Sequence, residues 1–182
     1  MNNVNNLAVI QARINSSRLK NKMLLKLSGK EILYWVIFRT LKSKLVDKTV
    51  VTIPSKDKKL ITIIEKFNVD IMFGDELNVL DRFNKVSQKY NFKNMIRICA
   101  DNPFIDPATI DHLINSFDQD TYDYAYNHRT MSYKYNDFLH IDGFGAEIFT
   151  KKALNKIVKN SYLKSHKEHI TKYIWDNKKK FK

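Results

Sequence analysis

Apolar and polar positions follow two distinct patterns along the chain. Short apolar runs, such as residues 7–10 (LAVI) and 95–99 (MIRIC), are typical of strands covered on both faces of a sheet. Residues 57–67 instead place apolar side chains at the spacing of an amphipathic helix. The whole pattern predicts strands at residues 7–12, 48–53, 69–73, 95–99, 122–126 and 140–149, and helices at residues 31–43, 57–67, 77–90, 108–117, 151–158 and 167–175.

The alternation of strands and helices indicates an α/β domain of three layers with a mostly parallel, mixed sheet. A length of 182 residues suits one domain with a substantial core, and we expect a single domain over residues 1–182. No internal repeat or low-complexity linker divides the chain. No stretch resembles a signal peptide, and no apolar run is long enough to cross a bilayer.

The formal net charge of +13 raises the question of nucleic-acid binding. Lysines are scattered over the predicted helices, however, and only residues 178–180 form a dense cluster. No helix-turn-helix, zinc-finger spacing or RNA-binding aromatic pair is present, so nucleic-acid binding ranks as a third hypothesis. The one cysteine, Cys99, cannot form an internal disulfide and is expected to be a reduced core residue, which fits a cytoplasmic location.

The segment after the first predicted strand carries the strongest functional signal. A loop that joins a strand to a helix lies at the edge where α/β sheets bind ligands. This loop contains Arg13, Arg18 and Lys22, whose charged groups suit the phosphates of a nucleoside triphosphate. The alternative is a solvated basic loop. The chain has no G-x-x-x-x-G-K-[ST] or G-x-G-x-x-G motif, which excludes a P-loop and a dinucleotide fingerprint.

Five stretches resemble one known family in the correct order. Residues 11–24, QARINSSRLKNKML, resemble the motif Q-A-R-x-x-S-x-R-L-P-x-K-x-L of nucleotidyltransferases that activate acidic sugars. The similarity is greatest to cytidylyltransferases of the spore-coat polysaccharide biosynthesis type. Residues 97–107 (RICADNPFIDP) resemble that family's R-x-x-x-D-x-P-x-I-D-P, and looser matches occur at residues 78–83 (NVLDRF), 142–149 (DGFGAEIF) and 168–174 (EHITKYI).

The resemblance implies a Rossmann-like nucleotide-binding fold of the nucleotide-diphospho-sugar transferase type. It implies a Mg²⁺-dependent enzyme that transfers CMP from CTP to an acidic sugar or related acceptor and releases pyrophosphate, for surface polysaccharide or glycan biosynthesis. Its partners would be CTP and a small acidic sugar, with no nucleic acid or membrane, and a homodimer remains open. The alternative is a glycosyltransferase of the same fold, or a nucleotide-binding module that lacks turnover. The D-x-D motif of Asp118 and Asp120 is interpreted as a surface turn.

Arg13, Lys22 and Asp101 are the expected catalytic residues. Asp101 follows a buried strand, and its carboxylate suits Mg²⁺, which prefers oxygen ligands. The resemblance makes Asp101 a metal ligand; the alternative is an aspartate that stabilises a turn. Asp106, directly before Pro107, is better explained as a helix N-cap.

The remaining candidates divide into a nucleotide side and an acceptor side. The resemblance places Gln11 and Ala12 against the base, and Asp81 and Arg82 near the base or ribose. A helix-surface ion pair explains Asp81 and Arg82 almost equally well. Arg97 interrupts an apolar strand and therefore needs a partner or a ligand. The candidates on the acceptor side are Asp142, Glu147, Glu168 and His169.

The chain departs from the family's motifs at three places. Lys20 and Asn21 stand where the motif has Pro and often Gly, which is expected to loosen the turn that aims Lys22. Gly145 replaces an acidic residue of the family's D-G-L-D-V-E. Relatives also continue into a V-D-x-P-E-D-L segment whose Asp is a second metal ligand. The open alternatives are a domain truncated at its C-terminus, a second ligand from Asp142 or Glu147, or impaired catalysis.

Overall fold

A six-stranded mixed sheet forms the centre of the protein in a computed structural model, which describes residues 4–14, 19–54, 57–127, 130–132, 138–140 and 144–182. The strand order is β5-β4-β1-β6-β10-β7. The first four strands are parallel, and β10 runs antiparallel to both β6 and β7. The strands are β1 (Val4–Gln11), β4 (Lys48–Pro54), β5 (Asp70–Gly74), β6 (Phe92–Cys99), β7 (Tyr124–Tyr126) and β10 (Glu147–Thr150).

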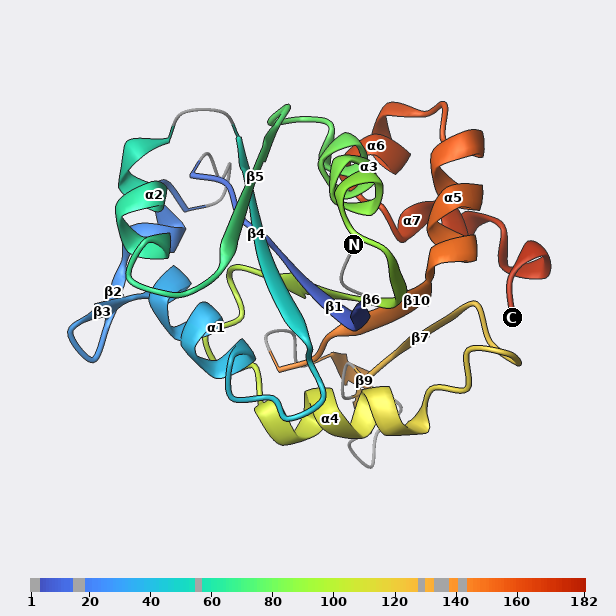
Figure 1. The fold of residues 1–182 in the computed structure, drawn as a ribbon, viewed down its shortest axis with the longest axis horizontal. Coiled ribbons are helices and arrows are strands. Elements are labelled where there is room, and N and C mark those ends of the chain that lie inside the picture. The colour runs from blue at the N-terminus through green and yellow to red at the C-terminus, as the bar shows by residue number, and fades with distance from the viewer. Residues whose placement is uncertain (1–3, 15–18, 55–56, 128–129, 133–137, 141–143) are drawn as a thin grey trace.

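Helices cover both faces of the sheet, as Figure 1 shows. Along β1, Ala8 and Ile10 pack on one side of the sheet, whereas Leu7 and Val9 pack on the other. The first side is covered by α1 (Ile32–Thr40), α2 (Lys58–Ile64) and α4 (Pro107–Ser116). The second side is covered by α3 (Val79–Lys89), α5 (Lys151–Asn160), α6 (Lys164–Glu168) and α7 (Lys172–Asp176). The expected three-layer α/β architecture with a mostly parallel sheet is therefore confirmed.

The register of the central strands brings their carboxyl ends to one edge. Gln11 at the end of β1 lies opposite Thr52 of β4 and Cys99 of β6. Two further hydrogen bonds extend this alignment beyond the strands: Ala12 N–H to the Thr52 carbonyl at 2.9 Å and Ala100 N–H to the Gln11 carbonyl at 3.1 Å. The segments that follow β1 and β6 therefore leave the sheet side by side, at the edge where α/β proteins bind ligands.

Side-chain caps fix the starts of several helices. Asp106 accepts a hydrogen bond from Thr109 N–H at 3.0 Å, and Pro107 occupies the first helical position of α4. The predicted N-cap is therefore confirmed. Asn78 caps α3 in the same way through Asp81 N–H at 3.0 Å. These caps set the positions at which α3 and α4 begin, after the carboxyl ends of β5 and β6.

The predicted boundaries are wrong at several places, including three in the C-terminal part of the chain. The helix expected at residues 167–175 is two short helices, α6 and α7, because His169 adopts an extended backbone conformation between them. The strand expected at residues 140–149 begins only at Glu147, and β9 (Phe138–His140) pairs instead with β8 (Thr130–Ser132). The strand expected at residues 122–126 begins at Tyr124.

A small hairpin precedes α1 and was not predicted. It consists of β2 (Lys26–Leu27) and β3 (Lys30–Glu31), after a single 3-10 turn, η1 (Lys22–Leu24). Ser28 and Gly29 form its two-residue turn with φ angles of 48° and 79°. Left-handed backbone at both positions is typical of a type I′ hairpin turn, which the Ser-Gly dipeptide favours. A second 3-10 turn, η2 (Lys178–Lys180), lies near the C-terminus.

Asp118 and Asp120 lie in a turn after α4. Asp118 accepts hydrogen bonds from Asp120 N–H at 3.1 Å and from the Thr121 hydroxyl at 2.6 Å. This D-x-D sequence is therefore a surface turn, as predicted.

Within the described residues, none of the helices combines the length and apolar character that a membrane span requires.

Candidate active site

Lys22 and Asp101 meet at the carboxyl edge of the sheet. The Lys22 Nζ lies 3.0 Å from Asp101 Oδ2, although the two residues come from η1 and from the loop after β6. Their side chains are 33% and 37% exposed, so both groups are accessible to a ligand. The structure thus brings together two of the three expected catalytic residues.

The turn that presents Lys22 is well defined despite the departures at Lys20 and Asn21. Asn21 adopts the left-handed conformation with φ of 57°, which Asn tolerates better than most residues. Its carbonyl accepts a hydrogen bond from Leu24 N–H at 2.8 Å, and the Lys22 carbonyl accepts one from Leu25 N–H at 3.2 Å. These two bonds close the turn that presents Lys22, and the expectation that loss of the proline loosens it stays a prediction.

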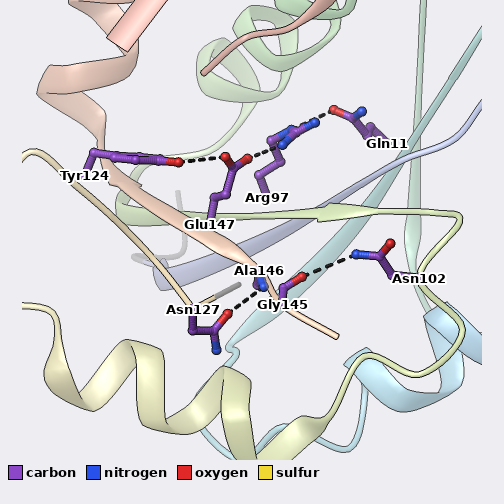
Figure 2. A network of polar contacts seen from close by, with 8 residues as sticks. All are labelled: Gln11, Arg97, Asn102, Tyr124, Asn127, Gly145, Ala146 and Glu147. Carbon is purple, nitrogen blue, oxygen red and sulfur yellow. Dashed lines mark hydrogen bonds and ion pairs between the residues drawn. The ribbon is translucent and has the colours of Figure 1, made fainter. Parts of the chain in front are cut away.

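Asn102 fixes the loop that carries Asp101. This side chain is buried, and its Nδ2 donates a hydrogen bond to the Gly145 carbonyl at 3.3 Å (Figure 2). Asn102 N–H also bonds to the Cys99 carbonyl at 3.1 Å, which closes the turn around Asp101. Asn102 was missed as a site residue, although a polar residue three positions after an apolar strand is a recognisable signal for such a role.

A cavity of about 50 Å³ lies at the end of β1. Arg13 reaches across it to α6, where its NH1 lies 3.2 Å from Glu168 Oε1. The lining comes from the end of β1, the start of α3 and the end of α6, and all but one of its residues were candidates from the sequence. It consists of Gln11, Ala12, Arg13, Val79, Arg82, Glu168 and His169.

Arg82 forms the inner wall of this cavity. Its side chain is only 1% exposed, and NH1 donates to the carbonyls of Ala12 at 2.9 Å and Thr52 at 3.2 Å. The Nε of Arg82 is buried and has no partner among the described residues. Burial lowers the pKa of Arg82 to about 10, and the neighbouring Arg13 acts in the same direction. A hydrogen-bond acceptor with negative charge would satisfy both arginines.

Asp81 and Arg82 therefore do not share one role. Asp81 is partly exposed and pairs with Lys85 at 2.7 Å, one helical turn along α3. The helix-surface ion pair considered for both residues is correct for Asp81 and wrong for Arg82. Arg82 bonds instead to backbone at the ends of β1 and β4.

The guanidinium group of Arg97 is bonded to other side chains of the protein. Its Nε donates to Gln11 Oε1 at 2.9 Å, and its NH1 forms an ion pair with Glu147 (Figure 2). Tyr124 donates its hydroxyl hydrogen to the other oxygen of Glu147 at 2.7 Å. Burial alone would raise the pKa of Glu147, but Arg97 and Tyr124 outweigh it and hold that pKa below the usual 4.5. Glu147 is therefore an ionised carboxylate whose two oxygens are both bonded inside the protein.

The other candidates are placed as follows. His169 lines the cavity next to Glu168, whereas Arg18 and Asp142 lie outside the described residues. Cys99 is half-buried at the end of β6. Over the part of the chain that the structure describes, no three His, Cys, Asp or Glu side chains are grouped to hold a metal ion by themselves.

Comparison with known proteins decides the family. The family model described as cytidylyltransferase matches residues 7–182. The chain belongs to the cytidylyltransferase family. The predicted resemblance is confirmed, and this family consists of nucleotidyltransferases.

The cytidylyltransferase relatives include the spore coat polysaccharide biosynthesis protein SpsF of Bacillus subtilis. It is 36% identical over 127 residues, which are 66% of this chain and 52% of SpsF. The chain thus spans about half the length of this relative.

Two solved structures share the cytidylyltransferase fold. A cytidylyltransferase from Leptospira borgpetersenii is 27% identical, with a TM-score of 0.85 over 97% of this chain and 73% of that one. The structure of CMP:2-keto-3-deoxy-manno-octonic acid synthetase complexed with CTP is 18% identical, with a TM-score of 0.69 over 96% of this chain and 86% of that one. The second likeness shows a common fold.

Proposed function

We propose that the protein is a Mg²⁺-dependent cytidylyltransferase that transfers CMP from CTP to an acidic sugar or a related acceptor and releases pyrophosphate. The observation that carries the proposal is the pairing of Lys22 with Asp101 at 3.0 Å, at the carboxyl edge of a sheet in a chain of this family. This pairing supports the proposal that one side chain serves as a cation for phosphates and the other as a carboxylate for a metal ion, both within reach of one triphosphate. Surface polysaccharide or glycan biosynthesis is the proposed pathway, which the similarity to SpsF supports.

The reaction requires charge neutralisation and positioning. An acceptor oxygen attacks the α-phosphorus of CTP, the bond from that phosphorus to the bridging oxygen of the β-phosphate breaks, and pyrophosphate leaves. Negative charge grows on the leaving pyrophosphate, so cations fixed beside it stabilise the transition state. Lys22 and Arg13 are proposed to supply these cations, and Arg18 of the same motif is proposed to assist.

The two cations are held in pairs that a ligand can replace. Lys22 pairs with Asp101 and Arg13 with Glu168, and all four side chains are about one third exposed. Ion pairs with this exposure contribute roughly 0–1 kcal/mol, so exchange of either partner for a phosphate costs little. The pairs keep the cations in place before the nucleotide binds.

The carboxylate of Asp101 is suited to hold a magnesium ion in nucleotidyl transfer. Mg²⁺ takes one or two carboxylates together with substrate phosphates, so a single accessible carboxylate is a sufficient protein contribution. Such an ion would neutralise phosphate charge, and Lys22 would then bond to the triphosphate in place of Asp101. Glu147 does not fit a second ligand, because Arg97 and Tyr124 occupy both of its oxygens.

The acceptor is proposed to bind on the side of Glu168 and His169, which lie together at the end of α6. A small acidic acceptor would find Arg13 and Arg82 on the neighbouring wall. We further propose a cytoplasmic enzyme with no nucleic-acid or membrane partner. Measurement of the molecular mass in solution will distinguish a monomer from a homodimer.

A thermal-shift series tests the nucleotide. Each of the four nucleoside triphosphates is added with Mg²⁺, and selective binding of CTP raises the midpoint of unfolding by mass action. A shift with ATP or UTP but none with CTP would overturn the choice of base.

Pyrophosphate release with CTP and a panel of acidic sugars then tests the reaction. Release with one sugar supports the enzyme and identifies its acceptor class. CTP binding without release from any acceptor would instead indicate a nucleotide-binding module.

A further inference from the structure

Four side chains form one continuous chain of polar contacts across four adjacent strands. Gln11 lies on β1, Arg97 on β6, Glu147 on β10 and Tyr124 on β7. Figure 2 shows that they follow one another in a row on the same side of the sheet. One end of the row, Gln11, lines the cavity with Arg13. The row therefore connects the cavity with the far edge of the sheet.

The chemistry of the row fixes the orientation of the Gln11 amide. A guanidinium only donates hydrogen bonds, so the atom of Gln11 that lies 2.9 Å from Arg97 Nε has to be the carbonyl oxygen, Oε1. The amide nitrogen, Nε2, then points away from Arg97. No acceptor in the described part of the protein bonds to this nitrogen. Gln11 thus presents a hydrogen-bond donor.

Arg97 is in turn held by charge. Its ion pair with Glu147 is buried, with side chains 12% and 6% exposed, so solvent does not screen it effectively. The Tyr124 hydroxyl occupies the second oxygen of Glu147 at 2.7 Å, which leaves that carboxylate one orientation. Each member therefore restricts the next one toward the cavity.

We infer that Arg97, Glu147 and Tyr124 are positioning residues that hold Gln11 as a hydrogen-bond donor to an acceptor atom of the bound nucleotide. The inference rests on the proposed function, since it takes CTP as the ligand of this cavity. From the sequence, Arg97 and Glu147 are expected to contact a ligand directly, whereas here they act on the ligand through Gln11. Tyr124 joins them, although no motif indicated it.

Double-mutant cycles for CTP affinity, measured by calorimetry with Mg²⁺, test this inference. Gln11→Ala removes the donor and should weaken CTP binding by about tenfold, the effect of one hydrogen bond. Tyr124→Phe keeps the Arg97–Glu147 pair and should weaken binding severalfold. Glu147→Gln should weaken it by about as much as Gln11→Ala. In the Gln11→Ala background, neither second change should have any further effect on affinity.

Tyr90→Phe is the matched control, because it also removes a tyrosine hydroxyl from a carboxylate. Tyr90 donates to Asp70, which lies on β5 at the opposite edge of the sheet. This variant should lower stability and leave CTP affinity unchanged. Cooperative thermal unfolding will show whether each variant is folded. Tyr124→Phe loses only one hydroxyl group, so it tests the inference even if Glu147→Gln does not fold.

The outcomes separate the two levels of the proposal. Suppose that the wild-type protein binds CTP and that Tyr124→Phe weakens binding equally in the wild-type and Gln11→Ala backgrounds. Tyr124 would then have a purely structural role, which overturns the inference but not the proposed function. Wild-type protein that binds none of the four triphosphates would overturn the proposed function and the inference with it.

Discussion

Gly74 is the position at which one added methyl group should disturb Arg82, which lines the cavity at the end of β1. It ends β5, and a Cβ built on it would lie 2.5 Å from Cγ of Arg82. This distance is far shorter than ordinary contact, and Cγ belongs to the inner part of a side chain that is 1% exposed. Gly74→Ala therefore has to displace Arg82.

The displacement has a calculable energy. Arg82 donates to the Ala12 and Thr52 carbonyls at 2.9 and 3.2 Å, and a bond from a charged group is worth roughly 1.5–3 kcal/mol. Partial loss of these bonds together with overpacking predicts destabilisation of about 2–4 kcal/mol. For a domain of this size, that corresponds to a decrease of roughly 5–15 °C in Tm. CTP affinity should also fall, because Arg82 lines the cavity.

Calorimetric unfolding and CTP titration of four proteins measure the effect: wild type, Gly74→Ala, Arg82→Ala and the double variant. Once Arg82 is shortened the clash is absent, so Gly74→Ala should add less than about 0.5 kcal/mol in that background. An unchanged Tm in Gly74→Ala would refute the reasoning. Equal destabilisation in both backgrounds would show that the methyl group acts elsewhere than on Arg82.

Three further outcomes are expected. Asp101→Asn should abolish turnover yet leave Tm within a few degrees, because its side chain is 37% exposed; unchanged metal dependence of the variant would contradict its role as a ligand. Lys22→Ala should weaken CTP binding by about ten- to a hundredfold and CMP binding much less, since only CTP carries β- and γ-phosphates; equal losses would contradict that placement. The Tyr90 hydroxyl holds the pKa of Asp70 below its usual 3.8, so this contact stabilises the fold above about pH 4 and less as pH falls through the lowered pKa. Unfolding of Tyr90→Phe across pH 2–7 should accordingly approach wild type at the acid end, and a constant difference would contradict the coupling.

The layers of the fold were predictable because burial follows strand periodicity. Residues 7–10 pack alternately on the two helical layers, and the sequence is apolar at all four positions, as a strand covered on both faces requires. The break between α6 and α7 was not predictable in the same way. It depends on the extended backbone of His169, whereas local apolar spacing continues through it. The Ser28–Gly29 turn, by contrast, has a local cause, because a Ser-Gly dipeptide favours left-handed backbone in a two-residue hairpin turn.

The site was predictable as a set of residue types but not as a set of partners. The motifs gave Lys22 and Asp101, and their pairing follows from parallel strands whose ends share one edge. Nothing local distinguishes Asp81 from its neighbour Arg82, yet one faces solvent and the other the interior. Such a difference depends on where α3 docks, which is set by contacts far apart in the sequence.

The charge pairs of the site differ in a way that bears on how a ligand binds. Lys22–Asp101 and Arg13–Glu168 are partly exposed, and such pairs contribute roughly 0–1 kcal/mol. The pair of Arg97 with Glu147 is buried, and removal of one partner from such a pair costs about 3–5 kcal/mol. A triphosphate that competes for cations will therefore draw on the exposed pairs and leave the buried one intact. Lys22 and Arg13 should change partners on binding, whereas Gln11 should keep the orientation that it has in the free protein.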